Sequence, residues 1–244
     1  MFRLLKALPL TLALAALFLF TGCGSSSSQA RFVNAIPDAG VLDIDVGGTK
    51  EFSSVAFATA SGSNYVGVPS GSVTIEGFAS GTTTEAFTTS GVSLNSGSEY
   101  TLVAVGFLTG SVIVLNPVDN NTEPADGMVS FRVINASPSG GTVDVYILPN
   151  PISCQLGTQP GDCAPTIPAL AYQSTSTYAT QSFNSNGQNF TLIVTTSGNT
   201  TPIFSFPLPS VGSSSLGSIR TLVLTDNSSG TAINDEPIVL DDLN

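Results

Sequence analysis

Two aspartates on one predicted strand, Asp43 and Asp45, have the type and spacing that come closest to supporting catalysis. Residues two apart on a strand share a face at about 7 Å, and paired carboxylates carry out glycoside hydrolysis. In the second half of the chain, however, Tyr146 stands at the position that corresponds to Asp45. We therefore interpret both aspartates as a solvated strand face. A carboxylate-dependent extracytoplasmic hydrolase acting on glycans remains the alternative.

Other catalytic chemistry lacks its residues in this sequence. The chain contains no histidine, which excludes Ser-His and Cys-His catalysis and every imidazole metal site. After residue 22, Lys50 is the one lysine that a Ser-Lys dyad could use, and it lies beside a Gly-Gly turn. We therefore expect no enzyme, no catalytic residues and no cofactor.

Two acidic clusters contain the oxygen ligands that calcium prefers. The first comprises Asp119, Asn121, Glu123 and Asp126, and the second comprises Asp235, Glu236, Asp241 and Asp242. Pro124 and the missing central glycine do not fit an EF-hand loop. We interpret the clusters as a linker and a tail, assign no metal site, and leave calcium binding open.

Cys154 and Cys163 lie in a proline-rich segment near residues 149–168. Disulfides persist in oxidising compartments, and closing so short a loop contributes about 2–3 kcal/mol in the chain-entropy model. The alternative, a metal or redox pair, lacks further ligands and the C-x-x-C spacing. We predict a disulfide that holds an irregular loop, and loops on rigid scaffolds are frequent binding sites.

One polar motif occurs twice, at an offset of 101. Its members are Arg31, Asn34 and Asp43, which return as Arg132, Asn135 and Asp144. A hairpin that turned near residues 38 and 39 would place Asn34 opposite Asp43, with Arg31 as a charge partner. Because Asn and Asp at turns commonly satisfy backbone groups, we interpret the motif as structural. A binding site present twice is the alternative.

The chain begins with the pattern of a secretory signal. Arg3 and Lys6 form a basic start, an apolar run extends to Phe20, and Thr21-Gly22 precede Cys23. This is the order of a positive region, an apolar region and small residues before a cleavage site. The apolar run is shorter than the ~20 residues of a spanning helix, so a signal is favoured over a plain transmembrane anchor.

Cys23 resembles the lipobox cysteine of bacterial lipoproteins, with Phe20 where leucine is usual. The resemblance implies a signal peptide at 1–22, acylation of Cys23, and a lipid-anchored place in the cell envelope. Gly24 follows the cysteine where an aspartate would retain the protein at the inner membrane, so the resemblance favours the outer membrane. It does not distinguish the periplasmic face from the surface face.

The charge balance restricts the partners. Removal of Arg3 and Lys6 leaves 6 − 2 = 4 basic residues against 17 acidic ones. Nucleic acid is therefore excluded, because its binding depends on basic side chains. Anionic headgroups also repel such a domain, so the lipid on Cys23 must hold it at the membrane. A protein or polysaccharide ligand remains.

The mature chain contains two copies of one domain. Further matches follow the polar motif in the same order: Ser80-Gly81 with Ser197-Gly198, Thr101-Leu102-Val103 with Thr221-Leu222-Val223, and Val114-Leu115 with Val239-Leu240. We divide the chain into an acylated, serine-rich tether at 23–29, repeat 1 at 30–116, a linker at 117–129 and repeat 2 at 130–244. The offset grows most between Asp144 and Ser197, where repeat 2 has its cysteine-containing insertion.

Both repeats have the apolar period of β-strands. Leu42, Ile44 and Val46 alternate with aspartates before a Gly-Gly turn, the pattern of a hairpin. Residues 73–76 also alternate, and residues 101–105 and 112–115 have the composition of more fully buried strands. These patterns predict an all-β protein with two tandem β-sandwich domains, immunoglobulin-like or transthyretin-like.

The motif R-x-x-N-A-x-P-x-x-G-x-[LV]-D-[IV] resembles the opening of the bacterial domain-of-unknown-function family 4397. Val68-Pro69-Ser70-Gly71 resembles that family's turn, and Asn184-Ser185-Asn186-Gly187 replaces it in repeat 2. The resemblance implies secreted or surface-attached β modules, often in tandem, with no established activity.

The function that we expect is a membrane-anchored envelope lipoprotein acting as a non-catalytic binding, adhesion or structural module. We expect repeat 2 to lie farther from the membrane and to carry any binding surface on its stapled insertion.

Overall fold

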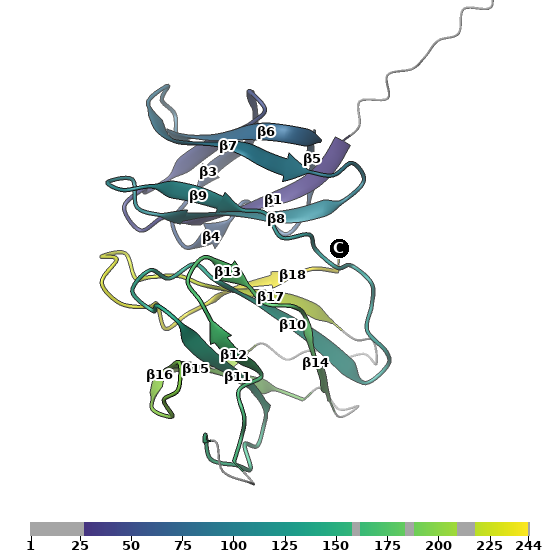
Figure 1. Cartoon of the computed structure of the whole chain (residues 1–244). Coiled ribbons are helices and arrows are strands. Elements are labelled where there is room, and N and C mark those ends of the chain that lie inside the picture. Colours follow the sequence, from purple (N-terminus) through teal and green to yellow (C-terminus); the bar gives the residue numbers. More distant parts are fainter. Residues whose placement is uncertain (1–26, 158–161, 184–187, 209–217, 244) are drawn as a thin grey trace, which may run out of the picture.

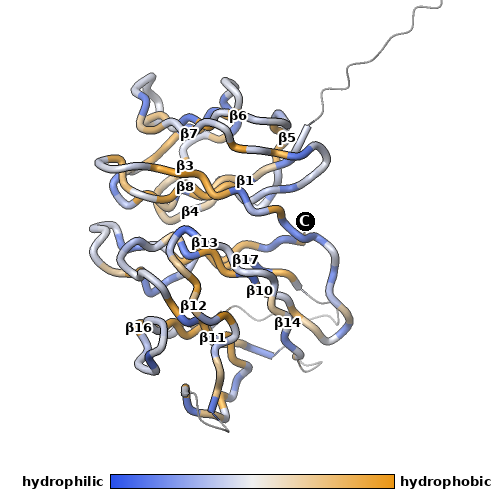
Figure 2. The backbone as a smooth tube through the Cα atoms, in the orientation of Figure 1, coloured by the Kyte–Doolittle hydropathy of each residue, from blue (hydrophilic) through white to orange (hydrophobic). Residues whose placement is uncertain are grey.

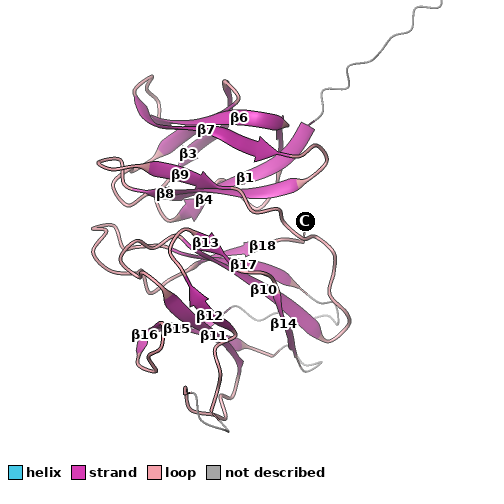
Figure 3. Cartoon of the chain, viewed as in Figure 1, coloured by secondary structure: helices cyan, strands magenta, loops and turns pink. Residues whose placement is uncertain are grey.

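The computed structural model describes residues 27–157, 162–183, 188–208 and 218–243. Cys23 and the signal peptide lie outside these ranges. All regular structure in the described residues is β-strand (Figure 3), which confirms the all-β prediction. The same residues include no long apolar helix of the kind that crosses a membrane.

Repeat 1 consists of two sheets. The first contains β1 (Ser27–Ala35), β4 (Thr59–Ala60), β5 (Val66–Pro69), β8 (Glu99–Gly106) and β9 (Val112–Leu115), in the order β4-β1-β8-β9, and β5 also pairs with β1. The second contains β2 (Leu42–Val46), β3 (Thr49–Val55), β6 (Gly71–Ala79) and β7 (Glu85–Leu94), in the order β3-β2-β6-β7. All pairs are antiparallel except β1 with β8. The predicted β2–β3 hairpin is present, with Val46 opposite Thr49.

Repeat 2 has the same two sheets in the same order. Its first sheet contains β10 (Met128–Asn135), β13 (Ser174–Thr175), β14 (Ala179–Ser182), β17 (Ile219–Leu224) and β18 (Ile238–Asp241). Its second contains β11 (Val143–Pro149), β12 (Ile167–Leu170), β15 (Phe190–Thr196) and β16 (Pro202–Leu208). Among its described strands, the parallel pair of β10 with β17 corresponds to that of β1 with β8.

Each sandwich has its own apolar core between its two sheets. Alternate residues of β2, such as Leu42 and Ile44, face one core, and Val143 and Val145 of β11 face the other. Phe32 stacks on Phe52 in repeat 1, with ring centroids 5.8 Å apart. The apolar segments therefore lie along the facing strands of each sandwich (Figure 2).

A third apolar cluster joins the two repeats. Its buried members are Val33, Ala35, Val103 and Val105 of repeat 1 and Ile134, Ala136, Val223 and Leu240 of repeat 2. The first sheets of the two repeats thus pack face to face, giving four layers of sheet in the molecule (Figure 1). We call these two sheets the inner sheets, the other two the outer sheets, and their contact the repeat interface. Strands β1, β8, β10 and β17 are covered on both faces, which explains their nearly continuous burial.

Candidate functional site

The motif arginines lie at the repeat interface, where each meets an aspartate of the other copy. Arg31 Nη2 donates to Asp242 Oδ1, and Arg132 Nη2 donates to Asp119 Oδ1. Asp119 follows β9 of repeat 1, and Asp242 follows β18 of repeat 2. The two ion pairs are therefore reciprocal, and each copy supplies the carboxylate that the other copy's arginine requires.

One threonine in each repeat links the motif arginine to the carboxylate of the same repeat. Thr101 Oγ1 accepts from Arg31 Nε at 2.9 Å and donates to Asp119 Oδ2 at 2.6 Å. Thr221 Oγ1 accepts from Arg132 Nε at 3.0 Å and donates to Asp242 at 2.7 Å. The two ion pairs thus belong to one connected polar network, which we call the interface network.

Two tyrosines complete the interface network. The ring of Tyr65 lies 5.0 Å from the guanidinium of Arg31, and that of Tyr178 lies 4.8 Å from Arg132. Tyr178 Oη donates to Asp242 Oδ2 at 2.7 Å, and Tyr65 Oη donates to Asp119. Burial raises the pKa of both phenols, and the neighbouring carboxylates raise it further. The hydroxyls therefore stay protonated as donors.

The interface network overturns part of the interpretation of the acidic clusters. The predicted linker residue Asp119 and the predicted tail residue Asp242 both have fully buried side chains. Buried charges persist only when they are paired and hydrogen-bonded, and here both carboxylates are. No three acidic or cysteine side chains in the described part of the chain are grouped as a metal ion would require.

The tyrosines and threonines of the network were missed at the sequence level as functional partners. Thr101 and Thr221 belong to a repeated block that was recognised only as a strand. Tyr65 and Tyr178 recur at an offset of 113, between the offsets of the flanking blocks. That intermediate offset was the signal that could have identified them.

The motif asparagines fasten a turn in each repeat. Asn34 Nδ2 donates to the carbonyls of Gly40 and Val55, at 3.0 and 3.2 Å, and Asn34 Oδ1 accepts from Ile36 N. Asn135 does the same with Gly141, Leu170 and Ser137. The predicted pairing of Asn34 with Asp43 across a hairpin is wrong, because β1 and β2 belong to different sheets. Arg31 is likewise paired with Asp242 and not with this turn.

Asp43 fastens a second turn of repeat 1 and is not on a solvated face. It accepts from Lys50 Nζ at 2.8 Å, Ser54 N at 2.9 Å, Ser80 Oγ at 2.9 Å and Gly81 N at 3.3 Å. The side-chain bond from Lys50 contributes most to lowering the pKa of Asp43, and the other three bonds lower it further. Because Asp43 is only 5% exposed and held ionised, it cannot serve as a general acid.

Asp144 has the same role in repeat 2. It accepts from Ala169 N at 2.7 Å, Gly198 N at 2.8 Å and Ser197 Oγ at 3.2 Å. Burial by itself would raise the pKa of Asp144, but these bonds outweigh it and lower the pKa. The repeated Ser-Gly dipeptide is therefore explained, because its hydroxyl and amide both bind the motif aspartate.

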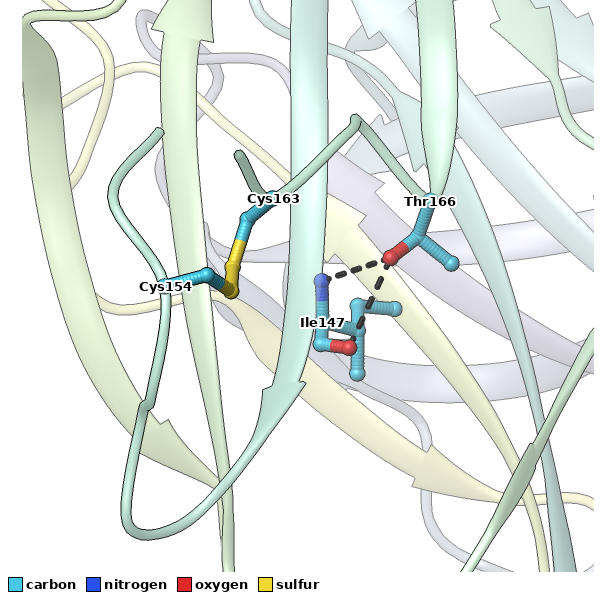
Figure 4. The surroundings of a disulfide bond; sticks show 4 residues. All are labelled: Ile147, Cys154, Cys163 and Thr166. Atoms are coloured by element: carbon cyan, nitrogen blue, oxygen red, sulfur yellow. Dashed lines mark hydrogen bonds between the residues drawn. A yellow bond between two sulfur atoms is a disulfide. The ribbon is translucent and has the colours of Figure 1, made fainter. Parts of the chain in front are cut away.

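Cys154 and Cys163 form the predicted disulfide, with Cα atoms 5.4 Å apart (Figure 4). The two cysteines and Leu156 pack on the exterior of the outer sheet of repeat 2, against Tyr146, Leu148 and Ile193. Beside the disulfide, Thr166 Oγ1 accepts from Ile147 N at 2.9 Å. The stapled loop thus covers an apolar patch of its own repeat.

The corresponding exterior face of repeat 1 carries a small polar hollow. It has a volume of about 190 Å³ and is lined by Asp45, Lys50, Phe78, Thr82 and Thr83. Asp45 Oδ1 is buried in this hollow and has no hydrogen-bond partner among the described residues. Lys50 donates to Asp43, but 49% of its side chain is exposed. The hollow is therefore lined by a carboxylate, a cation and an aromatic ring.

A larger groove, of about 530 Å³, lies where the two repeats meet. One wall is formed by residues 58–63, around β4 of repeat 1, and the other by residues 234–241, which include β18 of repeat 2. Arg31 lies at its base, bound to the backbone carbonyl of Asp241.

Comparison with known proteins bears on the fold. Residues 28–146 match the family model described as a domain of unknown function (DUF4397), which confirms the predicted resemblance over that range. No curated protein matches the chain.

Among solved structures, the chain is similar to a streptococcal virulence factor described for alpha-glucan binding. The two are 13% identical, with a TM-score of 0.32, over 87% of this chain and 97% of that one. A family 26 carbohydrate-binding module of Eubacterium rectale Amy13K, in complex with maltoheptaose, is 14% identical, with a TM-score of 0.26, over 87% and 95%. A candidate adhesin from Bacteroides ovatus is 10% identical, with a TM-score of 0.25, over 88% and 95%. Likenesses of this size indicate nothing about the ligand of this chain.

Proposed function

We propose that the protein is a non-catalytic envelope module that is anchored to the outer membrane by lipid on Cys23 and binds a polysaccharide. The observation that carries the proposal is the hollow of repeat 1. A sugar ring presents hydroxyls that both donate and accept hydrogen bonds, together with an apolar face of C–H groups. Asp45 supplies an acceptor, Lys50 and Thr83 supply donors, and Phe78 supplies an apolar aromatic face.

A binding role fits the carboxylates better than hydrolysis does. Glycoside hydrolysis in most families needs one protonated and one ionised carboxyl group flanking the bond. Both oxygens of Asp43 accept hydrogen bonds and its pKa is lowered. Asp45 is therefore left without the acid partner that it would need.

Anchoring through Cys23 rests on the pattern of the signal and on the charge of the chain. With its formal net charge of −11, the chain is repelled by anionic membrane surfaces, so attachment requires the acyl chains. Mass spectrometry of the N-terminal peptide from the purified membrane form tests this directly. A diacyl or triacyl mass on Cys23 is expected, and an unmodified cysteine in an uncleaved chain would contradict it.

Polysaccharide binding is tested with the mature chain carrying Cys23→Ser, which leaves the protein soluble. Binding to envelope and extracellular polysaccharides is measured on a glycan array and then by calorimetry. Replacing Phe78 with alanine should weaken binding by about tenfold, given the energy of an aromatic contact. Thr83→Ala should also weaken it. Thr200→Ala, at the equivalent position in repeat 2, is the matched control and should have no effect.

Two results would refute the proposed site. An unchanged affinity of Phe78→Ala and Asp45→Asn for every bound polysaccharide would place binding elsewhere. Release of shorter glycans by the wild-type chain would restore the hydrolase alternative.

A further inference from the structure

The outer edge of β18 presents backbone groups that are not used in its own sheet. Asp242 N donates to Ile219 O at 3.0 Å, and Arg220 lies opposite Asp241 in the antiparallel register. Because residues of an antiparallel strand bond alternately to one side and the other, Val239 and Asp241 direct their N–H and C=O groups away from β17. The bond from Arg31 Nη1 to the carbonyl of Asp241 shows the same direction.

The equivalent edge in repeat 1 is joined to the outer sheet of its own repeat by side-chain hydrogen bonds. Strand β9 corresponds to β18, and the carbonyl of Val118 accepts from Arg132 Nη1 at 2.9 Å, as that of Asp241 accepts from Arg31; the two repeats agree in this bond. Along β9, Thr89 Oγ1 of β7 donates to the carbonyl of Val112 at 3.2 Å, and Asn116 Nδ2 donates to that of Ser93 at 2.8 Å. Within the described ranges, no hydrogen bond joins β16 to β18 in this way. The two repeats therefore differ at this edge.

The groove of about 530 Å³ lies along the open edge of β18 and is of the size that ligand sites have, about 300–1,000 Å³. The opposite wall consists of small residues: Ala58, Thr59, Ala60, Gly62 and Ser63. In that wall Ser61 N donates to Phe32 O at 2.7 Å, and Ala60 lies opposite Val33. By the same alternation, the backbone of Ala60 faces the groove. The backbone around β4 of repeat 1 and the edge strand β18 of repeat 2 thus lie on opposite sides of the groove.

The charge along the groove indicates the kind of partner. Glu236 lines the groove and is exposed, and Asp235 beside it is exposed too. The chain as a whole has a formal net charge of −11. None of the described residues that line this groove is aromatic, in contrast to the hollow of repeat 1. Arg31 at the base of the groove is buried and paired with Asp242, and Asp241 is paired with Arg220, so Glu236 is the exposed charge that the groove presents. The groove therefore offers backbone hydrogen bonds and a negative charge, and no stacking surface for a sugar.

We infer that β18 binds an extended, basic polypeptide segment, which adds to the inner sheet of repeat 2 as an antiparallel strand. In this mode, main-chain hydrogen bonds supply affinity and alternate side chains supply specificity. The segment would bond to the N–H and C=O of Val239 and to the N–H of Asp241, which point away from β17, and its basic side chains would lie near Glu236. This site is separate from the polysaccharide hollow, so either proposal can fail alone.

The probe is a synthetic seven-residue peptide of alternating lysine and valine, titrated into the ¹⁵N-labelled mature chain with Cys23→Ser. We expect shifts of the amide signals along β18 and slower hydrogen exchange of the Val239 amide. Val239→Pro should lower the affinity for the peptide at least tenfold. Because the Val239 N–H does not bond to β17, proline at this edge position leaves the sheet pairing intact, and urea unfolding checks that the variant folds.

Two N-methylated peptides keep the test independent of any protein variant. One is methylated on every valine nitrogen and the other on every lysine nitrogen, so that each blocks one edge of the peptide strand. Strand addition predicts that only one of the two retains binding. Equal affinities for the two methylated peptides would overturn the proposal, as would the absence of binding by the unmodified peptide, or shifts confined to residues outside the groove.

Discussion

Arg31 forms a buried ion pair with Asp242, which lies 211 residues further along the chain. The pair joins the first strand of repeat 1 to the end of the last strand of repeat 2, and Arg132 with Asp119 forms its counterpart. A repeat without its partner would therefore lose the carboxylate that its motif arginine binds in the other copy. The two ion pairs thus stabilise the packing of the repeats against one another.

Removal of the Asp242 carboxylate should strongly destabilise the protein. Asp242→Ala leaves Arg31 buried, with Asp119 as its nearest remaining carboxylate, 3.6 Å from Nη2. Breaking a buried ion pair from one side costs about 3–5 kcal/mol. The free energy of unfolding in urea measures the change. Asp235→Ala, in an exposed residue of the same segment, is the control and should change it by less than about 0.5 kcal/mol. Equal effects of the two variants would show that the ion pair is not stabilising.

The protein should lose stability as the pH falls below about 4, the usual range of an aspartate pKa. Asp43 and Asp144 have lowered pKa values in the folded state. A lowered folded pKa gives stability that is present above the unfolded pKa and is lost as the pH falls toward the folded value. The free energy of unfolding is measured at pH values from about 6 down to about 2, on both sides of the unfolded aspartate pKa of about 4. Its change with pH is the slope. Asp43→Asn should flatten it, and an unchanged slope would contradict the role given to Asp43.

Gly81 should not tolerate a side chain, although space is available for one. A Cβ at Gly81 meets nothing within 4 Å, but the residue has a φ of +74°. An L-residue in this left-handed region costs about 1–2 kcal/mol, so Gly81→Ala should lower the free energy of unfolding by that amount. Gly67→Ala is the matched control, because Gly67 also has open space and no positive φ. Thermal unfolding compares the stabilities of the two variants. An unchanged stability of Gly81→Ala would contradict the cost given to the positive φ of Gly81.

Loss of the disulfide should destabilise repeat 2 in two ways, by freeing the unfolded loop and by uncovering an apolar patch. Cys154 and Cys163 are nine positions apart, and the chain-entropy model gives about 2–3 kcal/mol for such a loop. Cys154→Ser with Cys163→Ser should also expose the apolar patch of Tyr146, Leu148 and Ile193. Urea unfolding and binding of a hydrophobic dye measure the two effects. Reductant should weaken the wild type and leave the double variant unchanged; equal stability of both proteins would refute the prediction.

The sequence by itself determined the two repeats, several of the strands and the Gly-Gly hairpin turn. Alternating apolar residues mark strands because a strand exposes opposite faces in turn, so β2, β6, β8 and β9 were predictable. The doubly covered strands were visible in part, since residues 101–105 lack a polar face. The disulfide followed from two cysteines in one loop. Each of these features depends on residues close together in the chain.

Only the tertiary structure decided how the polar residues are partnered. Arg31, Asn34 and Asp43 belong to one short motif, yet the arginine enters the repeat interface, the asparagine fastens one turn and the aspartate another. Asp119 and Asp242 resembled linker and tail residues because composition does not show whether a carboxylate is buried. The packing of the two inner sheets sets the partners of both aspartates. The alternation of apolar residues along a strand shows that one face is buried, but it does not show which element covers that face.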